Sequence, residues 1–184
     1  MKENNDPTVN WKKELLEWLK ILLAAAAIAL FINTCVIANT RVPSDSMETT
    51  IMAGDRLLGS RLSYRFGSHP QRGDIVIFKH KAEPGRDQTR LVKRVIGLPG
   101  ETVDIRDNRI YINGSDTPLE EPYLPEPMET DDRHFEVPEG CYLMLGDNRN
   151  VSADARMWED PYVPETDISA KVFFRYYPGF KRVS

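Results

Sequence analysis

The sequence predicts an all-β domain of antiparallel sheets, preceded by one transmembrane α-helix. Two observations predict it. An apolar run without charged residues lies near the N-terminus, and the chain after it consists of short segments rich in β-branched and aromatic residues, separated by Gly, Pro and Asn turns. The length of 184 residues fits one domain once the apolar run is set aside. Such a domain can bury a core without disulfide bonds.

The apolar run defines the predicted helix. Residues 11–20 alternate Trp and Leu with Lys and Glu, a pattern typical of a helix entering a membrane interface, and residues 21–38 carry no charge. At 1.5 Å per residue, 18 residues span about 27 Å, close to the hydrocarbon core of a bilayer. We therefore predict a transmembrane helix over residues 19–38.

The flanking charges predict the orientation of this helix. Lys12, Lys13 and Lys20 precede the uncharged run, whereas Arg41 alone follows it closely. Because basic residues favour the cytosolic side, residues 1–18 are expected in the cytosol and residues 39–184 outside the cell membrane, with lipid as a partner of the helix.

Two other interpretations of the apolar run are open. It could be a cleaved signal peptide, with Val36 and Ala38 as small residues before the cut, or a lipoprotein anchor through Cys35. The long amphipathic segment before the run argues against the first. The polar pair Asn33–Thr34 before Cys35 argues against the second.

Strands are expected where apolar and β-branched residues lie between turns. Arg106-Asp107-Asn108 is predicted to be a hairpin turn, and residues 115–133, rich in Pro and acidic residues, are predicted to form a long loop. The predicted strands cover residues 55–58, 74–78, 91–96, 102–105, 109–112, 141–145 and 171–177.

Composition narrows the functional classes. The chain has 24 Lys and Arg against 28 Asp and Glu, a net charge of -4, which argues against a general nucleic-acid binder. The two cysteines, Cys35 and Cys141, are expected to be free thiols. The histidines, His69, His80 and His134, are scattered without the spacing of a zinc site, so neither metal nor cofactor is expected.

Ser46 is the candidate nucleophile, within Pro43-Ser44-Asp45-Ser46-Met47 shortly after the apolar run. No histidine lies in a context that suggests a triad. Lys93 is the candidate base, because in a strand it shares a face with Leu91 and Val95, and burial of that face would lower the pKa of the amine. A neutral lysine can accept a serine proton. In the alternative, Lys93 faces solvent and Arg94 faces inward.

Five motifs in order resemble the conserved segments of bacterial type I signal peptidases. The similarity extends from about residue 19 to residue 177, and the single helix resembles the short forms of Gram-positive bacteria. The motifs are Pro43–Met47, Gly54-Asp55, Arg72–Val76, Lys93–Gly100, and Gly146–Arg149 followed by Ser152, Asp154 and Arg156.

The resemblance implies the fold of a signal peptidase catalytic domain, in which residues of about 101–140 form a smaller non-catalytic insertion. It implies that Ser46 is the nucleophile and Lys93 the general base of a Ser-Lys dyad. The Ser44 hydroxyl and the Ser46 N–H would form the oxyanion hole. Ser152 would orient the Lys93 amine, supported by a polar network of Asp147, Arg149, Asp154 and Arg156.

The implied activity is removal of signal peptides from secreted precursors. The cleavage region would lie extended between residues 41–43 and residues 90–92, as an added strand. Small apolar pockets would accept Ala or Gly and exclude larger side chains. The residues implied at these pockets are Val42, Pro43, Met47, Ile51, Leu91 and Val92.

The sequence departs from the family pattern at four positions. Thr49 stands where the family often has proline, Asn150 and Val151 replace an Asp-Asn pair, and Ala155 replaces a common serine. These changes bear on substrate preference and loop rigidity. None of them alters Ser46, Lys93 or Ser152.

Two other functions are weighed against this one. A catalytically silent, membrane-anchored β-domain that binds precursors would have no need of both Ser46 and Lys93. A self-cleaving repressor-type peptidase shares the logic of the dyad, but it would carry a DNA-binding helical domain in place of the anchor.

Overall fold

The computed structural model describes residues 11–81 and 88–183. The chain divides into two compact units, Met1–Val36 and Ile37–Ser184. The first unit is helical and the second is built from antiparallel sheets. The fold class predicted from the sequence is therefore confirmed.

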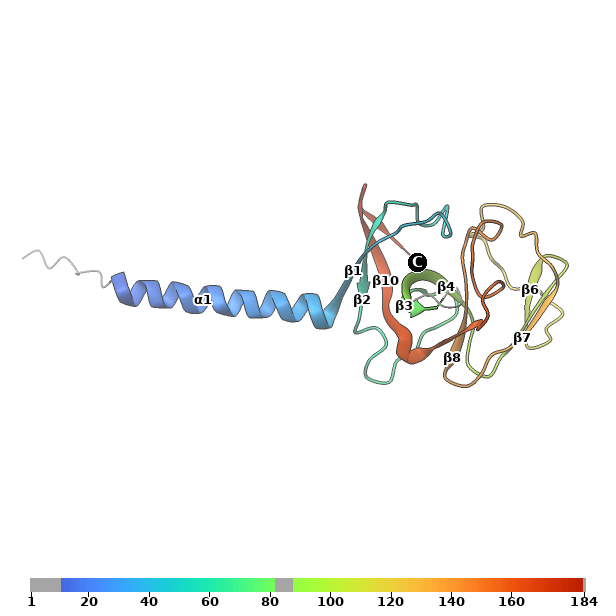
Figure 1. The fold of residues 1–184 in the computed structure, drawn as a ribbon, viewed down its shortest axis with the longest axis horizontal. Coiled ribbons are helices and arrows are strands. Elements are labelled where there is room, and N and C mark those ends of the chain that lie inside the picture. The colour runs from blue at the N-terminus through green and yellow to red at the C-terminus, as the bar shows by residue number, and fades with distance from the viewer. Residues whose placement is uncertain (1–10, 82–87, 184) are drawn as a thin grey trace, which may run out of the picture. The chain divides into compact units, whose positions relative to one another are not determined.

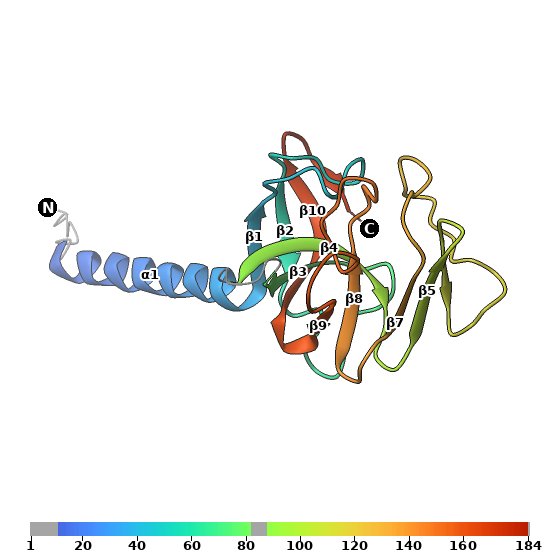
Figure 2. The same ribbon diagram turned by 45° about the vertical axis from the view of Figure 1, so that its right-hand side comes forward.

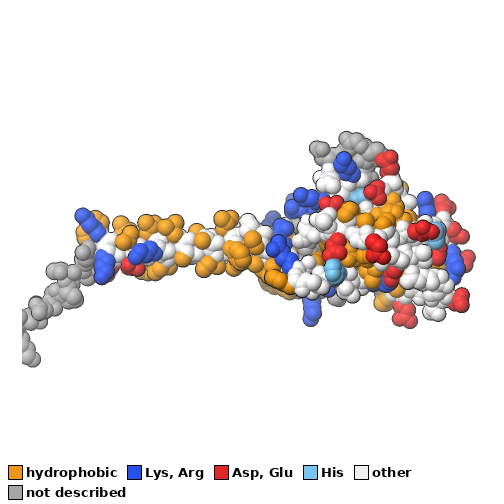
Figure 3. Space-filling view, turned by 90° about the horizontal axis from the view of Figure 1, so that it is seen from below, with side chains coloured by type: hydrophobic (Ala, Val, Ile, Leu, Met, Phe, Trp, Pro, Cys, Tyr) orange, Lys and Arg blue, Asp and Glu red, His pale blue; other side chains and the backbone are white. Residues whose placement is uncertain are grey.

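The helical unit consists of α1 (Trp11–Phe31) continued by a π-helical turn, η1 (Ile32–Val36). Within the described residues this unit buries none of its side chains, and its surface is hydrophobic along most of its length (Figure 3). The helix is long and apolar enough to cross a membrane. It begins eight residues before the predicted boundary, because residues 11–18 are also good helix formers. It ends at Val36, before the predicted residue 38.

Among the described residues, eight strands form the large sheet, in the order β1-β2-β10-β3-β4-β8-β9, with β11 paired to β10 (Figure 1). Each pairing is antiparallel, and β1, β2 and β10 lie side by side. β4 is long and strongly curved, and it links the β3 side of the sheet to β8 (Figure 2). The bounds are β1 (Ile37–Arg41), β2 (Arg56–Ser60), β3 (Ile75–His80), β4 (Thr89–Gly97), β8 (Cys141–Leu145), β9 (Tyr162–Pro164), β10 (Ile168–Tyr177) and β11 (Lys181–Arg182), with a short 3-10 helix η2 (Glu165–Asp167) before β10.

In the part of the chain that the structure describes, three strands form a small second sheet, in the order β6-β5-β7. They are β5 (Thr102–Arg106), β6 (Arg109–Ile112) and β7 (Arg133–Glu136). Asp107 and Asn108 both have positive φ, the conformation of a two-residue type I′ hairpin turn. The predicted hairpin is thus present. The small sheet falls within the range of about 101–140 expected for an insertion.

Two hydrophobic cores lie within the β unit. The larger joins the inner faces of β3, β4 and β8 to the small sheet, through residues such as Val95, Leu143 and Ile105. The smaller lies among β2, β3 and β10, and Met47 and Ile51 belong to it. Strand β4 contributes to both cores, so it is held firmly where the candidate base is located.

Each strand predicted from the sequence is present, within a few residues at its ends. Four strands were not predicted: β1, β7, β9 and β11. β1 begins at Ile37, within the last two residues of the apolar run that was predicted to be helical, and it has no alternating pattern. Its conformation comes from pairing with β2. β7 begins at Arg133, the last residue of the predicted loop, so most of that loop is confirmed and its end is not.

Candidate active site

Ser46 lies in a tight turn that follows β1. The smaller core anchors this turn, because the side chains of Met47 and Ile51 are fully buried in it. The Ile51 N–H also donates to the Met47 carbonyl at 2.9 Å. Met47 and Ile51 were expected to line the substrate pockets. In the structure they anchor the turn that presents Ser46.

Hydrogen bonds from a loop about 100 residues later in the sequence also hold the Ser46 turn in place. The Asn148 N–H donates to the Ser46 carbonyl at 3.1 Å, and the Asn148 side-chain amide donates to the Asp45 carbonyl at 3.1 Å. Both bonds tie the Ser46 turn to the loop of residues 146–156, which we call the catalytic loop. A role for Asn148 was missed from the sequence, although it lies inside one of the quoted motifs.

Lys93 lies on β4 with 3% of its surface exposed, so the alternative in which it faces solvent is excluded. Its Nζ donates to the Ser152 hydroxyl at 2.8 Å. Burial lowers the pKa of Lys93 to about 8, with Asp154 and Asp147 acting in the opposite direction and Arg156 in the same one. A larger share of the amine is therefore neutral near pH 7 than in a free lysine, whose pKa is 10.5.

Ser44 is close to the candidate nucleophile. Its hydroxyl is exposed and lies 3.4 Å from the Ser46 hydroxyl, at the long end of hydrogen bonding. An exposed hydroxyl beside the candidate nucleophile can turn toward a developing oxyanion, as the resemblance implies for Ser44.

A hollow of about 470 Å³ brings Ser46 and Lys93 together. Four of the six predicted substrate-contact residues line it: Val42, Pro43, Leu91 and Val92. The remaining lining residues are Ser44, Asp45, Arg90, Val151 and Ala153. A serine hydroxyl and a buried amine thus open into one cavity with mostly apolar walls, the arrangement that nucleophilic catalysis on a bound peptide requires.

Gly146 separates the serine turn from Ser152. A Cβ added at this position would lie 2.2 Å from the Ser152 hydroxyl and 2.4 Å from the Ser46 carbonyl oxygen. The Gly146 N–H donates to Asp154 at 3.0 Å. Only glycine lets the Ser46 turn and the Ser152 hydroxyl approach this closely.

Three buried ion pairs support the catalytic loop. Asp147 receives two bonds from Arg94, at 2.9 and 2.8 Å, and one from Thr50 at 2.6 Å. Arg156 pairs with Asp154 at 2.8 Å. The third pair joins Arg149 to Glu121 at 2.5 Å. The four predicted network residues are therefore present here, each with a buried side chain.

Two members of these pairs, Arg94 and Glu121, were not identified from the sequence as parts of the site. Arg94 follows the candidate base along β4, and Glu121 lies in the segment predicted to be a plain loop. Arg94 lies inside the quoted motif Lys93–Gly100, although no role was assigned to it. Glu121 has no local signal, because it is defined by a partner distant in the sequence.

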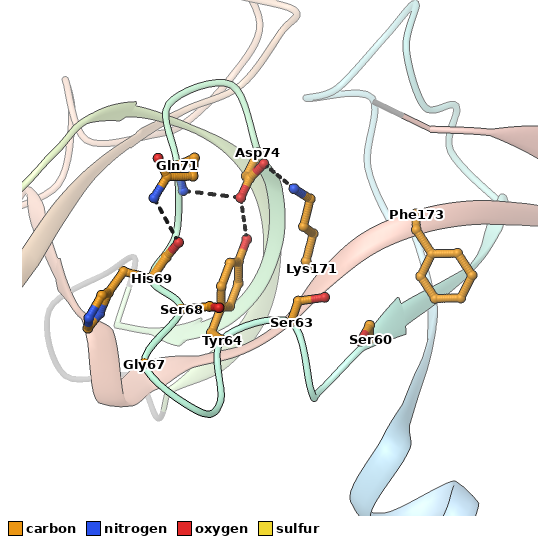
Figure 4. A pocket seen from close by; sticks show the side chains of 10 residues that line it. All are labelled: Ser60, Ser63, Tyr64, Gly67, Ser68, His69, Gln71, Asp74, Lys171 and Phe173. Carbon is orange, nitrogen blue, oxygen red and sulfur yellow. Dashed lines mark hydrogen bonds and ion pairs between the residues drawn. The ribbon is translucent and has the colours of Figure 1, made fainter.

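A second hollow, about 630 Å³ in volume, lies elsewhere on the β unit (Figure 4). Its central group is Asp74, whose carboxylate accepts bonds from Tyr64 at 2.8 Å and from the Gln71 N–H at 3.1 Å, and pairs with Lys171 at 2.5 Å. This carboxylate is fully engaged in holding the loop after β2. Although this hollow is larger, the first one contains the candidate nucleophile and base.

Within the described ranges, 11–81 and 88–183, no three His, Cys, Asp or Glu side chains gather as metal ligands. Cys35 and Cys141 are free thiols, as the sequence indicated.

The chain is similar to a known family, to curated proteins and to a solved structure. The family described as "Signal peptidase, peptidase S26" matches residues 15–177. A signal peptidase I from Leptolyngbya laminosa is 40% identical, over 89% of this chain and 80% of that protein, and one from Bacillus licheniformis is 35% identical, over 82% and 83%. A solved structure of a signal peptidase I from Enterococcus faecalis V583 is 38% identical and covers 56% of this chain and 97% of that one, with a TM-score of 0.47. The chain belongs to the signal peptidase family, peptidase S26.

Proposed function

We propose that this member of the signal peptidase family removes signal peptides from secreted precursors with a dyad of Ser46 and Lys93. The observation that supports this most strongly is that a buried lysine with a lowered pKa opens into the same hollow as the serine. In the proposed reaction, neutral Lys93 accepts the Ser46 proton as the hydroxyl oxygen attacks the scissile carbonyl.

Charge that develops on the carbonyl oxygen is stabilised by the Ser46 N–H and the Ser44 hydroxyl. The protonated Lys93 then donates its proton to the departing amine, and a water molecule hydrolyses the acyl enzyme with Lys93 again as the base. Ser152 orients the amine through its 2.8 Å hydrogen bond, so the proton is transferred from a fixed position.

The edge of β4 supports an extended substrate. In the described part of the chain, residues 89–93 pair with β3 alone, whereas β8 pairs with β4 from Arg94 onward. Residues 90–93 of that open edge line the hollow together with Val42 and Pro43. A precursor can therefore add as a strand beside β4, with small side chains pointing into the apolar hollow.

Anchoring by α1 is the second part of the proposal. We infer that the apolar stretch of α1 and η1 spans the cell membrane with residues 1–18 in the cytosol, because Lys12, Lys13 and Lys20 lie at the N-terminal end of that stretch. The β unit then lies outside, where precursors emerge. Added protease should digest the β unit in spheroplasts with an intact membrane. Protection until the membrane is permeabilised would reverse the orientation.

The dyad is tested with purified full-length protein in detergent and a precursor carrying Ala at the first and third positions before the cut. Ser46→Ala and Lys93→Ala should each lower kcat by a factor on the order of 10³ or more. Ser68→Ala and Lys79→Ala are matched controls at exposed positions and should cleave as the parent does. Parental rates for either dyad variant would show the assignment to be wrong.

The pH dependence gives an independent test. Because Lys93 has to be neutral to act as a base, kcat/KM should fall on the acid side with a midpoint near pH 8. A profile that stays flat down to about pH 5 would exclude lysine as the base. A protein that binds the precursor without cleaving it at any pH would instead be a silent binding domain.

A further inference from the structure

The segment Glu121–Glu129, which we call the clamp segment, lies against the catalytic loop. Glu121 receives two bonds from Arg149, at 3.1 and 2.5 Å. The Asn150 side chain donates to Glu126 at 2.8 Å and accepts from the Glu129 N–H at the same distance. Contacts are thus made at both ends of the segment and at two consecutive residues of the loop.

The Glu121–Arg149 pair is the buried part of this contact. The Arg149 side chain is 1% exposed and that of Glu121 is 7% exposed. Met128 is also buried, and its sulfur lies 3.7 Å from Arg149 Nη1. A buried pair of this kind costs desolvation energy and is sensitive to loss of either partner. It holds its two segments in a narrow range of positions, because a bidentate guanidinium contact is directional.

Arg149 also holds the part of the loop that separates Ser46 from Ser152. Its Nε donates to the Gly146 carbonyl at 2.9 Å. The Gly146 Cα lies close to the Ser152 hydroxyl and to the Ser46 carbonyl oxygen. A displacement of Arg149 therefore moves the peptide that spaces Ser46 from the hydroxyl holding Lys93.

A second contact reaches the strand of the base. The Arg94 guanidinium lies 3.9 Å from the centre of the Tyr123 ring, and the Tyr123 hydroxyl donates to Glu121 at 2.7 Å. Arg94 neighbours Lys93 on β4 and pairs with Asp147 at the start of the catalytic loop. The clamp segment thus contacts both elements that define the position of the Lys93 amine.

We propose that Glu121 is a positioning residue, which acts through Arg149 and Gly146 to hold Ser152 against the Lys93 amine. The proposal rests on the proposed role of Lys93. It gives the segment between β6 and β7 a part in the catalytic geometry, where the sequence indicated only a connecting loop.

The direction of the pKa change at Lys93 distinguishes positioning from a direct charge effect. The charged groups that act on the amine are Asp154, Arg156 and Asp147. Removal of a carboxylate acting at a distance would lower the pKa of Lys93, because it removes negative charge. Loosening of the catalytic loop would admit water to the amine and raise the pKa toward the ordinary value.

The experiment compares Glu121→Gln, Glu121→Asp and the parent as full-length protein in detergent, with the Ala-containing precursor. In Glu121→Gln, kcat should fall about tenfold with KM within about twofold, because positioning rather than binding is lost. The acid limb of kcat/KM should move upward by up to about one pH unit. Glu121→Asp keeps the negative charge on a shorter side chain. Its kcat and its acid limb of kcat/KM should lie between those of the parent and those of Glu121→Gln.

Glu120→Gln is the matched control, since it makes the same charge change at the neighbouring, exposed position and should leave both parameters as in the parent. A 13C NMR titration of the labelled Lys93 side chain follows the pKa without any need for activity. It therefore tests the clamp segment even where Lys93→Ala shows that the dyad is wrong.

An unchanged kcat in folded Glu121→Gln would overturn the proposal. A lower kcat would also overturn the proposal if the pKa of Lys93 stayed unchanged or fell. Where Glu121→Gln fails to fold, as judged by near-UV circular dichroism, Glu121→Asp decides by the same two measurements. If kcat and the pKa of Lys93 in Glu121→Asp equal those of the parent, the positioning role of Glu121 is wrong. Values between those of the parent and those expected for Glu121→Gln support it.

Discussion

The ion pairs of the catalytic loop and those of the small sheet differ in their exposure to solvent. Around the catalytic loop the ion pairs are buried, and Arg94 and Asp147 have side chains 4% and 0% exposed. In the small sheet the pair of His134 and Asp104 has side chains 57% and 27% exposed. Both regions contribute side chains to the larger hydrophobic core, such as Ala155 from the loop and Ile105 from the small sheet. The difference therefore lies in the burial of charge.

The difference in burial indicates that the ion pairs of the catalytic loop fix the positions of its residues. A buried ion pair rarely adds stability over well-packed apolar residues, since desolvation offsets the attraction, but removal of one partner is costly. An exposed pair contributes little in either direction. The catalytic loop therefore carries charge pairs that fix positions, whereas the small sheet carries pairs that its stability hardly needs. Four changes test this contrast.

The largest effect is expected for Asp147→Asn. The substitution keeps the shape of the side chain and leaves the buried Arg94 guanidinium without its counter-charge. It should lower the free energy of unfolding by about 3 to 5 kcal/mol. Urea unfolding in detergent, followed by circular dichroism, measures the loss. A loss below about 1 kcal/mol would mean that this buried pair behaves as an exposed one.

Gly146→Ala should reduce kcat by about a hundredfold, because the added Cβ would displace either the Ser46 carbonyl or the Ser152 hydroxyl. Gly114→Ala in the turn after β6 is the control. Its φ of +68° makes alanine strained, but nothing lies within 4 Å of the added Cβ. The control should cost about 1 kcal/mol of stability and no activity. Steady-state kinetics with the precursor would show whether activity follows the close approach at Gly146.

Lys93→Met should abolish activity and stabilise the fold by roughly 2 kcal/mol at pH 7. Folding lowers the pKa of Lys93 from 10.5 to about 8, so burial of the charged amine costs about 3 kcal/mol of stability at pH 7. Methionine removes this cost but also loses the hydrogen bond to Ser152, which contributes about 1 kcal/mol. Between pH 8 and 10.5 the unfolded chain binds more protons, so the stability of the parent rises with pH and the advantage of methionine shrinks. Unfolding curves at pH 7 and pH 10 measure this; an advantage that grows with pH would contradict the burial argument.

The smallest effect is expected for Asp104→Asn in the small sheet. Asp104 raises the pKa of His134 by accepting its hydrogen bond at 2.6 Å, so the pair stabilises the fold at low pH and less as the pH rises through that pKa. The substitution should change the unfolding midpoint by less than about 2 °C and leave kcat unchanged. A large loss of activity would show that the small sheet takes part in catalysis, against the contrast drawn above.

Much of the fold could be predicted because its signals are local. The uncharged run, the β-branched segments and the turn at Asp107-Asn108 each depend on neighbours in the sequence. β1 and β7 could not be predicted in this way. Each becomes a strand by pairing, β1 with β2 and β7 with β5, and pairing is a property of the assembled sheet.

The candidate site divides along the same line. By itself, the sequence determined the residue types and order: an anchor, two serines, a lysine on an apolar strand face and a polar motif late in the chain. The tertiary structure decided that Met47 and Ile51 are buried as anchors of the turn, and that Lys93 reaches Ser152. It also decided that Glu121 meets Arg149. Burial and long-range pairing depend on how distant segments pack, and no local pattern encodes that packing.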